Sequence, residues 1–489
     1  MRLVLVVFIF LVQTLHSQNS TITSLDSSNI IEVVNSTFLG NEKRNYYGNS
    51  LPDKLDVIWK HNLGGGKTTI SRRSGEKMWY GSGWTGQPLL VLENNHPYII
   101  QGTYSHKLKK IDAENGKLVW DYDFGDVIKG SGSIWINPSP DSLADALVIT
   151  QGSRLGYGKY LDNPLVHSFR GISYFSGKEL WRHNCRQTAS YSRDVDGSAL
   201  FINDTGYLAF ENSYFTAFDP SVKGRIEADT IYKPQIYQQI LLYNDSDRVR
   251  HRGNLVSESS PCLLGDRIYT ASGTGHVYGY NLKKKVIDWD FFVGSDIDGS
   301  AIVTRDSCLL ISVEKQYIDG QGGVLKLNPR YEPKNAVEWY LPTGNVDFAG
   351  WEGGVIGSCS VNDQTNVFLG RKIGVVSALD NYMYVFEYDN INVDSGKVDG
   401  PNLEHKYYQP KLLFKYNIHK SISTPIIIGN RILACGYGGC YLFEFDYDMN
   451  FKLLDHIALG EVESTPFSYY GKVYIGSRNG FLYCLGRKD

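Results

Sequence analysis

The chain has 489 residues, including 50 Gly, 34 Tyr and only 16 Pro, and its 49 basic and 52 acidic residues leave a formal net charge of −3. A charge so close to zero creates no overall field that would draw the protein to nucleic acid or to an anionic membrane, so neither is expected as a partner. Apolar residues make up 42% and aromatic residues 13% of the chain. Together with frequent glycine, this composition favours a folded protein built from short strands and tight turns.

The N-terminus has the layout of a secretory signal peptide. One basic residue, Arg2, precedes the apolar run Leu3–Val12, which is too short to span a bilayer. No later stretch is long and apolar enough to predict a transmembrane span. We therefore expect residues 1–17 to be a cleaved signal peptide, with an uncleaved anchor as the alternative, and residues 18–54 to be a flexible spacer. The protein is then expected to be secreted, periplasmic or at the cell surface.

Repeats decide the predicted architecture. Segments 268–280, 432–445 and 473–486 each read as two short strands around a glycine turn, and such self-similarity is typical of a repeat fold. Hairpins of this kind follow starts made of small residues, of which the chain has eight: Gly86–Pro88, Gly132–Ser133, Gly197–Ser198, Ser259–Pro261, Gly299–Ser300, Gly357–Ser358, Ser423–Pro425 and Ser464–Pro466.

A last strand with one bulky apolar residue follows each hairpin, but only seven such strands come after the first start: those at Trp120, Trp181, Leu241, Trp289, Trp339, Phe414 and Leu454. The eighth is supplied by Leu55–Asn62, ahead of every start. We therefore predict that residues 55–489 form an all-β domain, a single eight-bladed β-propeller of four-stranded antiparallel blades. Its N-terminal strand completes the last blade and closes the ring, which removes open sheet edges.

Ile111–Trp120 and Ile172–Trp181 share a strand, a Gly-Lys turn and a tryptophan. In this they resemble the pyrroloquinoline-quinone (PQQ)-type repeat of the quinoprotein alcohol dehydrogenase-like β-propeller superfamily, and the resemblance covers residues 55–489. It implies the fold but no single chemistry, because the repeat serves quinoprotein dehydrogenases and also non-enzymatic scaffolds such as the propeller subunit of the outer-membrane assembly machinery. The enzymes typically place a disulfide of adjacent cysteines over the quinone, and no Cys-Cys pair occurs here. PQQ is therefore not expected, and the tryptophans are assigned to packing between blades.

The seven cysteines are an odd number and show no zinc-binding spacing. Cys435 and Cys440 flank a glycine-rich turn. Two interpretations remain open: the two thiols face each other across a hairpin, or they are simply small residues in two strands.

Candidate binding residues converge at one end of the predicted ring. In an up-and-down blade, the start of the first strand and the turn between the second and third strands lie at the same end, so these residues surround one central mouth. The strand starts are rich in carboxylates and the turns offer basic residues. The candidate ligand-binding residues are Asp196, Glu258, Asp298, Trp351, Glu352, Glu463, Arg154, Lys315, Arg371 and Arg478.

Clustered carboxylates repel one another, so something must offset their charge. Salt bridges to the basic turns would do so, and so would Ca²⁺, which prefers oxygen ligands. The candidate calcium ligands are Asp194, Asp196, Asp296 and Asp298.

A long turn, 152–167, is expected to overhang the mouth, where its aromatic residues, with Trp84 and Trp135, would suit stacking on a sugar ring. Alternatively, its tyrosines simply face solvent.

The function expected from these features is that of a binding or assembly scaffold, monomeric, which holds a protein segment or a glycan in its mouth and has no established cofactor. The alternative is an enzyme, either a PQQ- and calcium-dependent dehydrogenase or a carbohydrate-active enzyme that uses paired carboxylates. The sequence contains no Gly-x-Ser-x-Gly, P-loop or His-Glu-x-x-His motif that would support hydrolase, nucleotide or zinc-protease chemistry.

Overall fold

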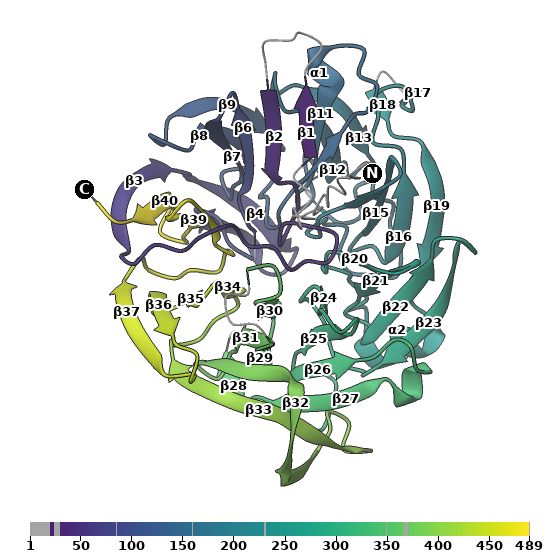
Figure 1. Ribbon diagram of the computed structural model, residues 1–489. Helices are drawn as coiled ribbons and strands as arrows, with labels where there is room; N and C mark the ends of the chain where they lie inside the picture. Colours follow the sequence, from purple (N-terminus) through teal and green to yellow (C-terminus); the bar gives the residue numbers. More distant parts are fainter. Residues whose placement is uncertain are drawn as a thin grey trace, which may run out of the picture.

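The computed structural model describes residues 20–23, 30–84, 86–158, 160–228, 231–348, 350–365 and 370–488. The predicted signal peptide, residues 1–17, lies outside these ranges. Eight antiparallel sheets stand around one axis like the blades of a propeller (Figure 1). Each has four blade strands, and in one of them two N-terminal strands extend the sheet to six. The predicted eight-bladed architecture is therefore confirmed.

The first four blades lie on one half of the ring, each beginning with its innermost strand. Blade one contains β6 (Leu89–Glu93), β7 (His96–Gly102), β8 (Lys107–Asp112) and β9 (Leu118–Asp123); blade two contains β10 (Ser133–Ile136), β11 (Leu147–Gly152), β12 (Phe169–Ser173) and β13 (Glu179–His183). Blade three contains β14 (Leu200–Ile202), β15 (Thr205–Ala209), β16 (Tyr214–Phe218) and β19 (Ile236–Leu241); blade four contains β20 (Cys262–Leu264), β21 (Arg267–Ala271), β22 (His276–Asn281) and β23 (Val286–Phe292).

The other four blades complete the ring. Blade five contains β24 (Ile302–Val303), β25 (Leu309–Val313), β26 (Gly323–Leu327) and β27 (Val337–Pro342); blade six contains β30 (Ser360–Val361), β31 (Ile373–Ser377), β32 (Tyr382–Asp399) and β33 (Lys406–Asn417). Blade seven contains β34 (Ile426–Ile428), β35 (Arg431–Gly436), β36 (Gly439–Phe445) and β37 (Phe451–Ile457); blade eight contains β38 (Phe467–Tyr469), β39 (Lys472–Gly476), β40 (Phe481–Gly486) and β3 (Asp56–Asn62).

Strand β3 closes the ring as predicted. It pairs antiparallel with β40, with Asp56 opposite Gly486 and Asn62 opposite Phe481. The last blade is thus made from both ends of the chain, and its outer strand comes from the N-terminal side.

The tryptophans of the last strands join each blade to the next. The indole N–H of Trp120 donates to the Tyr174 carbonyl oxygen at 3.0 Å, and Trp59, Trp181, Trp289 and Trp339 donate in the same way to Ala113, Pro220, Tyr331 and Tyr388. The ring of Trp120 also lies against Gly177, where an added Cβ would come within 2.8 Å of it. Glycine in the Gly-Lys turn therefore makes room for the tryptophan of the preceding blade.

A belt of hydroxyl side chains links the innermost strands and explains the small residues at their starts. The Ser198 amide donates to Ser260 Oγ at 2.9 Å, and the Ser260 amide donates to Ser300 Oγ at 2.8 Å. The same contact continues through Ser358 and Thr424. Each short hydroxyl thus accepts a hydrogen bond from the backbone of the preceding blade.

The N-terminal segment before β3 crosses the ring at the end opposite the mouth. Strand β2 (Ile30–Asn35) pairs with β1 (Ser20–Thr23) and with β6, which makes blade one six-stranded. The chain then passes over the inner strands, where the fully buried Arg44 donates to the carbonyl oxygens of Ser198 and Pro261. The expected flexible spacer over 18–54 is therefore wrong from Ile30 onward, because hydrogen-bonding partners from several blades hold this stretch in place.

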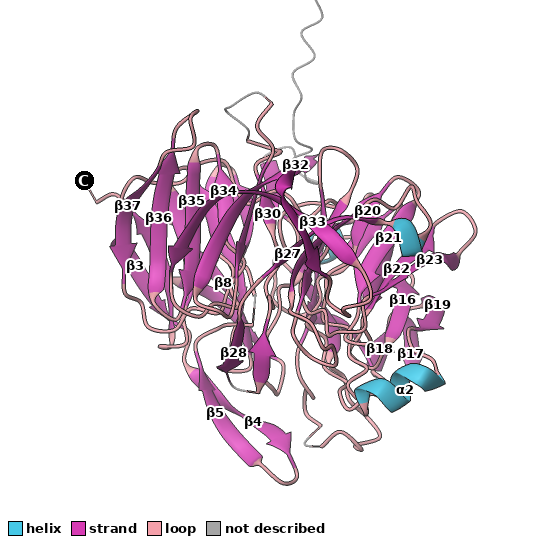
Figure 2. Cartoon of the chain, turned by 90° about the horizontal axis from the view of Figure 1, so that it is seen from below, coloured by secondary structure: helices cyan, strands magenta, loops and turns pink. Residues whose placement is uncertain are grey.

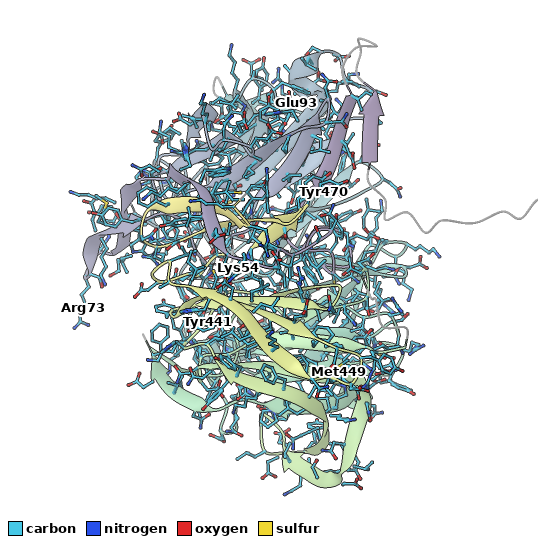
Figure 3. The ribbon with its side chains drawn as sticks, turned by 60° about the vertical axis from the view of Figure 1, so that its left-hand side comes forward. Lys54, Arg73, Glu93, Tyr441, Met449 and Tyr470 are labelled. Atoms are coloured by element: carbon cyan, nitrogen blue, oxygen red, sulfur yellow. The ribbon has the colours of Figure 1, made fainter. Side chains whose placement is uncertain are left out.

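Several insertions stand on the mouth end of the ring. Figure 2 shows the two-stranded arm β4 (Gly65–Ser71) and β5 (Gly75–Tyr80) projecting from this end, together with β28 (Asn345–Phe348) and α2 (Asp245–His251). Arg73, in the turn of the arm, points away from the ring (Figure 3). The remaining elements lie in connections between blade strands: α1 (Leu143–Ala146), β17 (Ile226–Ala228), β18 (Ile231–Lys233), η1 (Pro333–Asn335) and β29 (Trp351–Gly353). No helix in the described ranges is long and apolar enough to cross a bilayer.

Candidate functional site

A cavity of about 960 Å³ opens at the mouth. Its walls come from the β4–β5 arm, the turn after β11, the strand starts of blades three to five and the β28–β29 hairpin. Its acidic lining residues are Asp162, Asp194, Glu211, Glu258, Asp296 and Asp298, and its aromatic ones are Trp79, Trp84, Tyr160, Tyr191, Tyr317 and Trp351. The long turn 152–167 contributes to this wall, and the Asp162 carboxylate ties it to the arm through Arg72 at 2.5 Å.

The position two residues before each belt hydroxyl faces the axis, and its chemistry differs around the ring. Lys129, Asp196, Glu258 and Asp298 hold this position in blades two to five. Blades six and seven carry buried isoleucines there, packed beneath Trp84, Phe348 and Trp351. We call the side of the mouth formed by blades two to five its charged half. The side over blades six and seven is its apolar, aromatic half.

The first acidic group surrounds Lys129. Its Nζ lies 2.5 Å from Asp196 Oδ2 and 3.4 Å from both Asp194 Oδ2 and Glu211 Oε1, and Arg154 Nε lies 2.8 Å from Asp194 Oδ2. Burial disfavours the charged form of Asp194, but Arg154 and Lys129 outweigh it and hold the pKa below its usual value. This group is partly neutralised by the protein itself.

Two acids near Lys129 keep raised pKa values. Burial, with repulsion from Glu258 and Asp194, raises the pKa of Asp196 to about 7 despite the contact with Lys129. Burial, with repulsion from Glu211 and Asp296, raises the pKa of Glu258 to about 8. One ammonium group therefore does not offset all the carboxylates around it.

The second acidic group consists of Asp296, Asp298 and Glu314, whose ligand oxygens all lie within 4.8 Å of one another. Within the described ranges, no Lys or Arg forms an ion pair with any of the three. Asp296 Oδ1 and Glu314 Oε1 are buried without a hydrogen-bond partner. Burial, followed by mutual repulsion among the acids, raises the pKa of Asp298 and of Glu314 well above their usual values.

An amide completes this second group. Asn254 Nδ2 donates to Asp296 Oδ2 at 2.7 Å, while Asn254 Oδ1 is buried and has no partner. Three carboxylates and an amide oxygen form the kind of all-oxygen ligand set that hard cations prefer. A cation of the Ca²⁺ type fits the residues present, since it would satisfy oxygens that otherwise share protons or stay unpaired.

The residues do not fit PQQ in the same way. A polycarboxylate quinone needs basic partners, but the basic side chains among the described lining residues already pair with acids: Arg72 with Asp162, and Lys129 and Arg154 with the first acidic group. All seven cysteines are buried, and none is adjacent to another in sequence. The cavity is suited to a cationic ligand rather than to an anionic quinone.

Of the residues predicted from sequence to lie at the mouth, Arg154, Asp194, Glu258, Asp296, Asp298 and Trp351 line the cavity. Asp196 contacts Lys129 in the same wall. Glu463 and Arg478 pair with each other at 2.8 Å, outside the cavity lining. Glu352 is exposed, and the Lys315 side chain does not reach the lining, although its amide donates to the Gly353 carbonyl oxygen in the β28–β29 hairpin.

Two placements were wrong. Arg371 precedes β31 and therefore lies between the first and second strands, at the end opposite the mouth, where it pairs with Glu387. The cause is the long connection 362–372, which moves the second strand further along the chain than the repeat pattern indicated. Trp135 lies within β10, buried, and its indole N–H donates to Asp204 Oδ1 at 3.2 Å, so it does not face the mouth.

Sequence reasoning missed Lys129, Glu211, Glu314 and Asn254. Glu211 and Glu314 follow the second strands of blades three and five almost directly, where only basic turn residues had been considered. Lys129 stands three residues before a Gly-Ser start, as Asp194 and Asp296 do. These two signals were present in the repeats, whereas Asn254 lies in an insertion and has no repeat equivalent.

Fold and site together define an eight-bladed β-propeller with an acidic central mouth. No family model matches the sequence, and no curated protein matches it. Among solved structures, the chain is similar to BamB from Moraxella catarrhalis, with a TM-score of 0.54 and 12% identity over 88% of this chain and 100% of that one. It is also similar to a europium-containing methanol dehydrogenase, with a TM-score of 0.54 and 11% identity over 91% of each chain. The PQQ-type propeller fold is thus shared, and identities this low show the fold alone.

Proposed function

We propose that this protein is an exported binding scaffold whose mouth holds a hard cation of the Ca²⁺ type and, beside it, a basic segment of a partner protein. The observation that carries the proposal is the second acidic group, in which Asp296, Asp298 and Glu314 converge and form no ion pair with a Lys or Arg of the described ranges. Bringing three carboxylates together in a buried place is costly, and a bound cation is the simplest compensation.

The partner is inferred from the two halves of the mouth. Even with one divalent cation bound, the carboxylates of the two acidic groups outnumber the positive charges, so a Lys or Arg side chain is attracted to the charged half. The other half offers Trp351 and Phe348, which stack at 5.9 Å between ring centroids. A segment with a basic residue close to an apolar one matches both halves.

Calcium binding is tested with the double variant Asp298→Asn/Glu314→Gln. The native protein should bind Ca²⁺ in calorimetric titration and gain thermal stability from it, and the variant should do neither. The matched control is Glu463→Gln, which removes another buried mouth-end carboxylate that already pairs with Arg478. The cation site is refuted if the native protein binds neither Ca²⁺ nor a trivalent lanthanide ion. It is also refuted if the double variant binds Ca²⁺ as tightly as the native protein does.

The partner class is tested with two peptide libraries. One, the basic library, carries Lys and Arg, and the other carries neutral isosteres at the same positions. Enrichment of the basic library by the native protein, reduced by Glu258→Gln, supports the proposal. Enrichment on a glycan array instead, or dye-coupled alcohol oxidation after addition of PQQ and Ca²⁺, would favour the carbohydrate or dehydrogenase alternatives.

A further inference from the structure

Blade seven holds two cysteines that face each other. Cys435 in β35 and Cys440 in β36 are directly opposite in the antiparallel register, and their Sγ atoms lie 2.8 Å apart. The other five cysteines are Cys185, Cys262, Cys308, Cys359 and Cys484, each buried in or beside a different blade. This pair is therefore the one that the fold brings together.

The backbone around the pair allows a covalent link. Directly opposite residues of an antiparallel pair have Cβ atoms roughly 4.5–5.5 Å apart, slightly more than the roughly 3.5–4.5 Å of a disulfide, so the strands must approach a little. Gly436 and Gly439 follow and precede the cysteines as the next opposed pair, and Gly439 has a φ of 98°. Because neither glycine has a Cβ, no side chains at these two positions hold the strands apart.

We propose that Cys435 and Cys440 form a cross-strand disulfide. In thiol–disulfide exchange, one thiolate attacks an oxidised donor such as glutathione disulfide and forms a mixed disulfide, releasing one glutathione; the second cysteine then displaces the other glutathione. The two thiols lose two protons and two electrons, and the donor is reduced to two thiols. Both side chains are fully buried in the folded blade, so the exchange belongs to the folding stage, before blades six and eight cover them.

The bond would fix a turn that reaches the aromatic half of the mouth. Tyr437, between the two cysteines, donates its hydroxyl to Glu463 Oε1 at 2.7 Å. Its ring packs edge-on against Phe348, with centroids 5.0 Å apart. Phe348 in turn stacks on Trp351 of the mouth. The hairpin that carries the cysteines thus supports the wall on which the proposed apolar contact is made.

The test uses the full chain, refolded with a mixture of oxidised and reduced glutathione. The refolded protein is denatured without reductant and its thiols are alkylated. Of the seven cysteines, five should be labelled, and all seven should be labelled after reduction. A tryptic peptide running from Ile432 to Lys452 contains both cysteines. It should be two hydrogen atoms lighter before reduction than after it.

Two variants serve as controls. Cys440→Ala should show six labelled thiols with or without reductant, because Cys435 then has no partner. Cys484→Ala, in the neighbouring blade, should keep the disulfide and show four labels before reduction and six after. Seven labels in the native protein without reductant, or a bond that joins any other pair, overturns the proposal. Labelling of the native chain decides the matter even where a variant fails to fold.

Discussion

At the scale of a single residue, Lys129 offsets part of the negative charge of the mouth. It occupies the axis-facing position that carries acids in blades three to five, and its side chain is only 9% exposed. Its three carboxylate partners come from blade three. One buried ammonium group therefore permits an acidic wall that would otherwise repel itself.

Replacing this ammonium group tests its role. Lys129→Met should lower the free energy of unfolding by about 3–5 kcal/mol at pH 8, because it leaves buried carboxylates without their partner. The loss should be smaller at pH 5, where those acids can take up protons. Urea unfolding at both pH values measures the difference, and the exposed Lys60→Met serves as a control. An equal loss at both pH values would contradict this account.

The pH dependence of stability follows from the raised pKa values of Asp196 and Glu258, which are about 7 and about 8 and which face Lys129, Asp194, Glu211 and Asp296. Unfolded carboxyls titrate near pH 4, so between about pH 4 and pH 8 the folded state binds more protons than the unfolded state. Stability without metal should therefore fall as pH rises through this window, by up to about 1.4 kcal/mol per pH unit for each extra proton. Urea unfolding from pH 5 to pH 8 measures the slope. Glu258→Gln should flatten it, and a slope of opposite sign in the native protein refutes the argument.

At the scale of elements, the blades are joined by tryptophans that combine packing with a hydrogen bond. Trp339 is fully buried, and its indole N–H donates to the Tyr388 carbonyl oxygen of blade six at 2.8 Å. Its ring also meets Phe386 edge-on at 5.4 Å between centroids. The tryptophan of one blade thus holds that blade against the next one.

Substitution of Trp339 should separate the two contributions. Trp339→Ala should cost about 3–5 kcal/mol of unfolding free energy, because it leaves a large cavity between blades five and six. Trp339→Phe keeps most of the ring but leaves the Tyr388 carbonyl without its donor, so it should cost about 1–3 kcal/mol. Equilibrium denaturation measures both values. If the two variants lose the same amount, the packing contribution assigned to the ring is wrong.

At the scale of the whole molecule, the two ends of the ring are built differently. The segment between β2 and β3 crosses the opposite end of the ring, where the hydroxyl oxygen of Tyr47 accepts a hydrogen bond from the Val361 amide of blade six at 3.0 Å. Burial lowers the pKa of Arg44 to about 10, and this guanidinium donates to carbonyl and hydroxyl oxygens. Arg44 thus holds the segment against the inner strands of blades three and four.

Removing the Arg44 side chain should release the segment between β2 and β3 from the ring. Arg44→Ala leaves the carbonyl oxygens of Ser198 and Pro261 without a donor, so chymotrypsin should cut after Tyr46 or Tyr47 far faster than in the native protein. Arg72→Ala on the exposed arm is the control and should leave these cuts slow. Mass spectrometry of brief digests gives the rates. Unchanged cleavage in Arg44→Ala would show that other contacts hold the segment.

The repeat pattern was sufficient to predict the blades, because Gly-Ser starts and docking tryptophans recur at equivalent places and their spacing gives the strand count. It also predicted correctly that Glu258 and Asp298 lie at the mouth, since both precede a hydroxyl residue of the belt by two positions. Arg371 was misplaced because the length of one connection, 362–372, is not part of the repeat.

Other features depended on contacts between distant parts of the chain. The meeting of Asn254 with Asp296 joins an insertion to the start of another blade, and nothing in their local sequence indicates it. The packing of residues 36–54 was hidden for the same reason: Arg44 finds its partners in blades three and four, far along the chain. Polar residues in a segment without repeats resemble a linker until the surface that receives them is known.

The pairing of β3 with β40 also sets an order of events for the chain as it is made. Residues 56–62 emerge early but have no strand to pair with until residues 481–486 have been synthesised. Until then the outer edge of blade eight does not exist, and a strand close to the N-terminus must wait while the other blades form. Closing so long a loop is slow relative to the local hairpins. The strand therefore stays unpaired at least as long as it takes to synthesise the rest of the chain, and loop closure adds to that time.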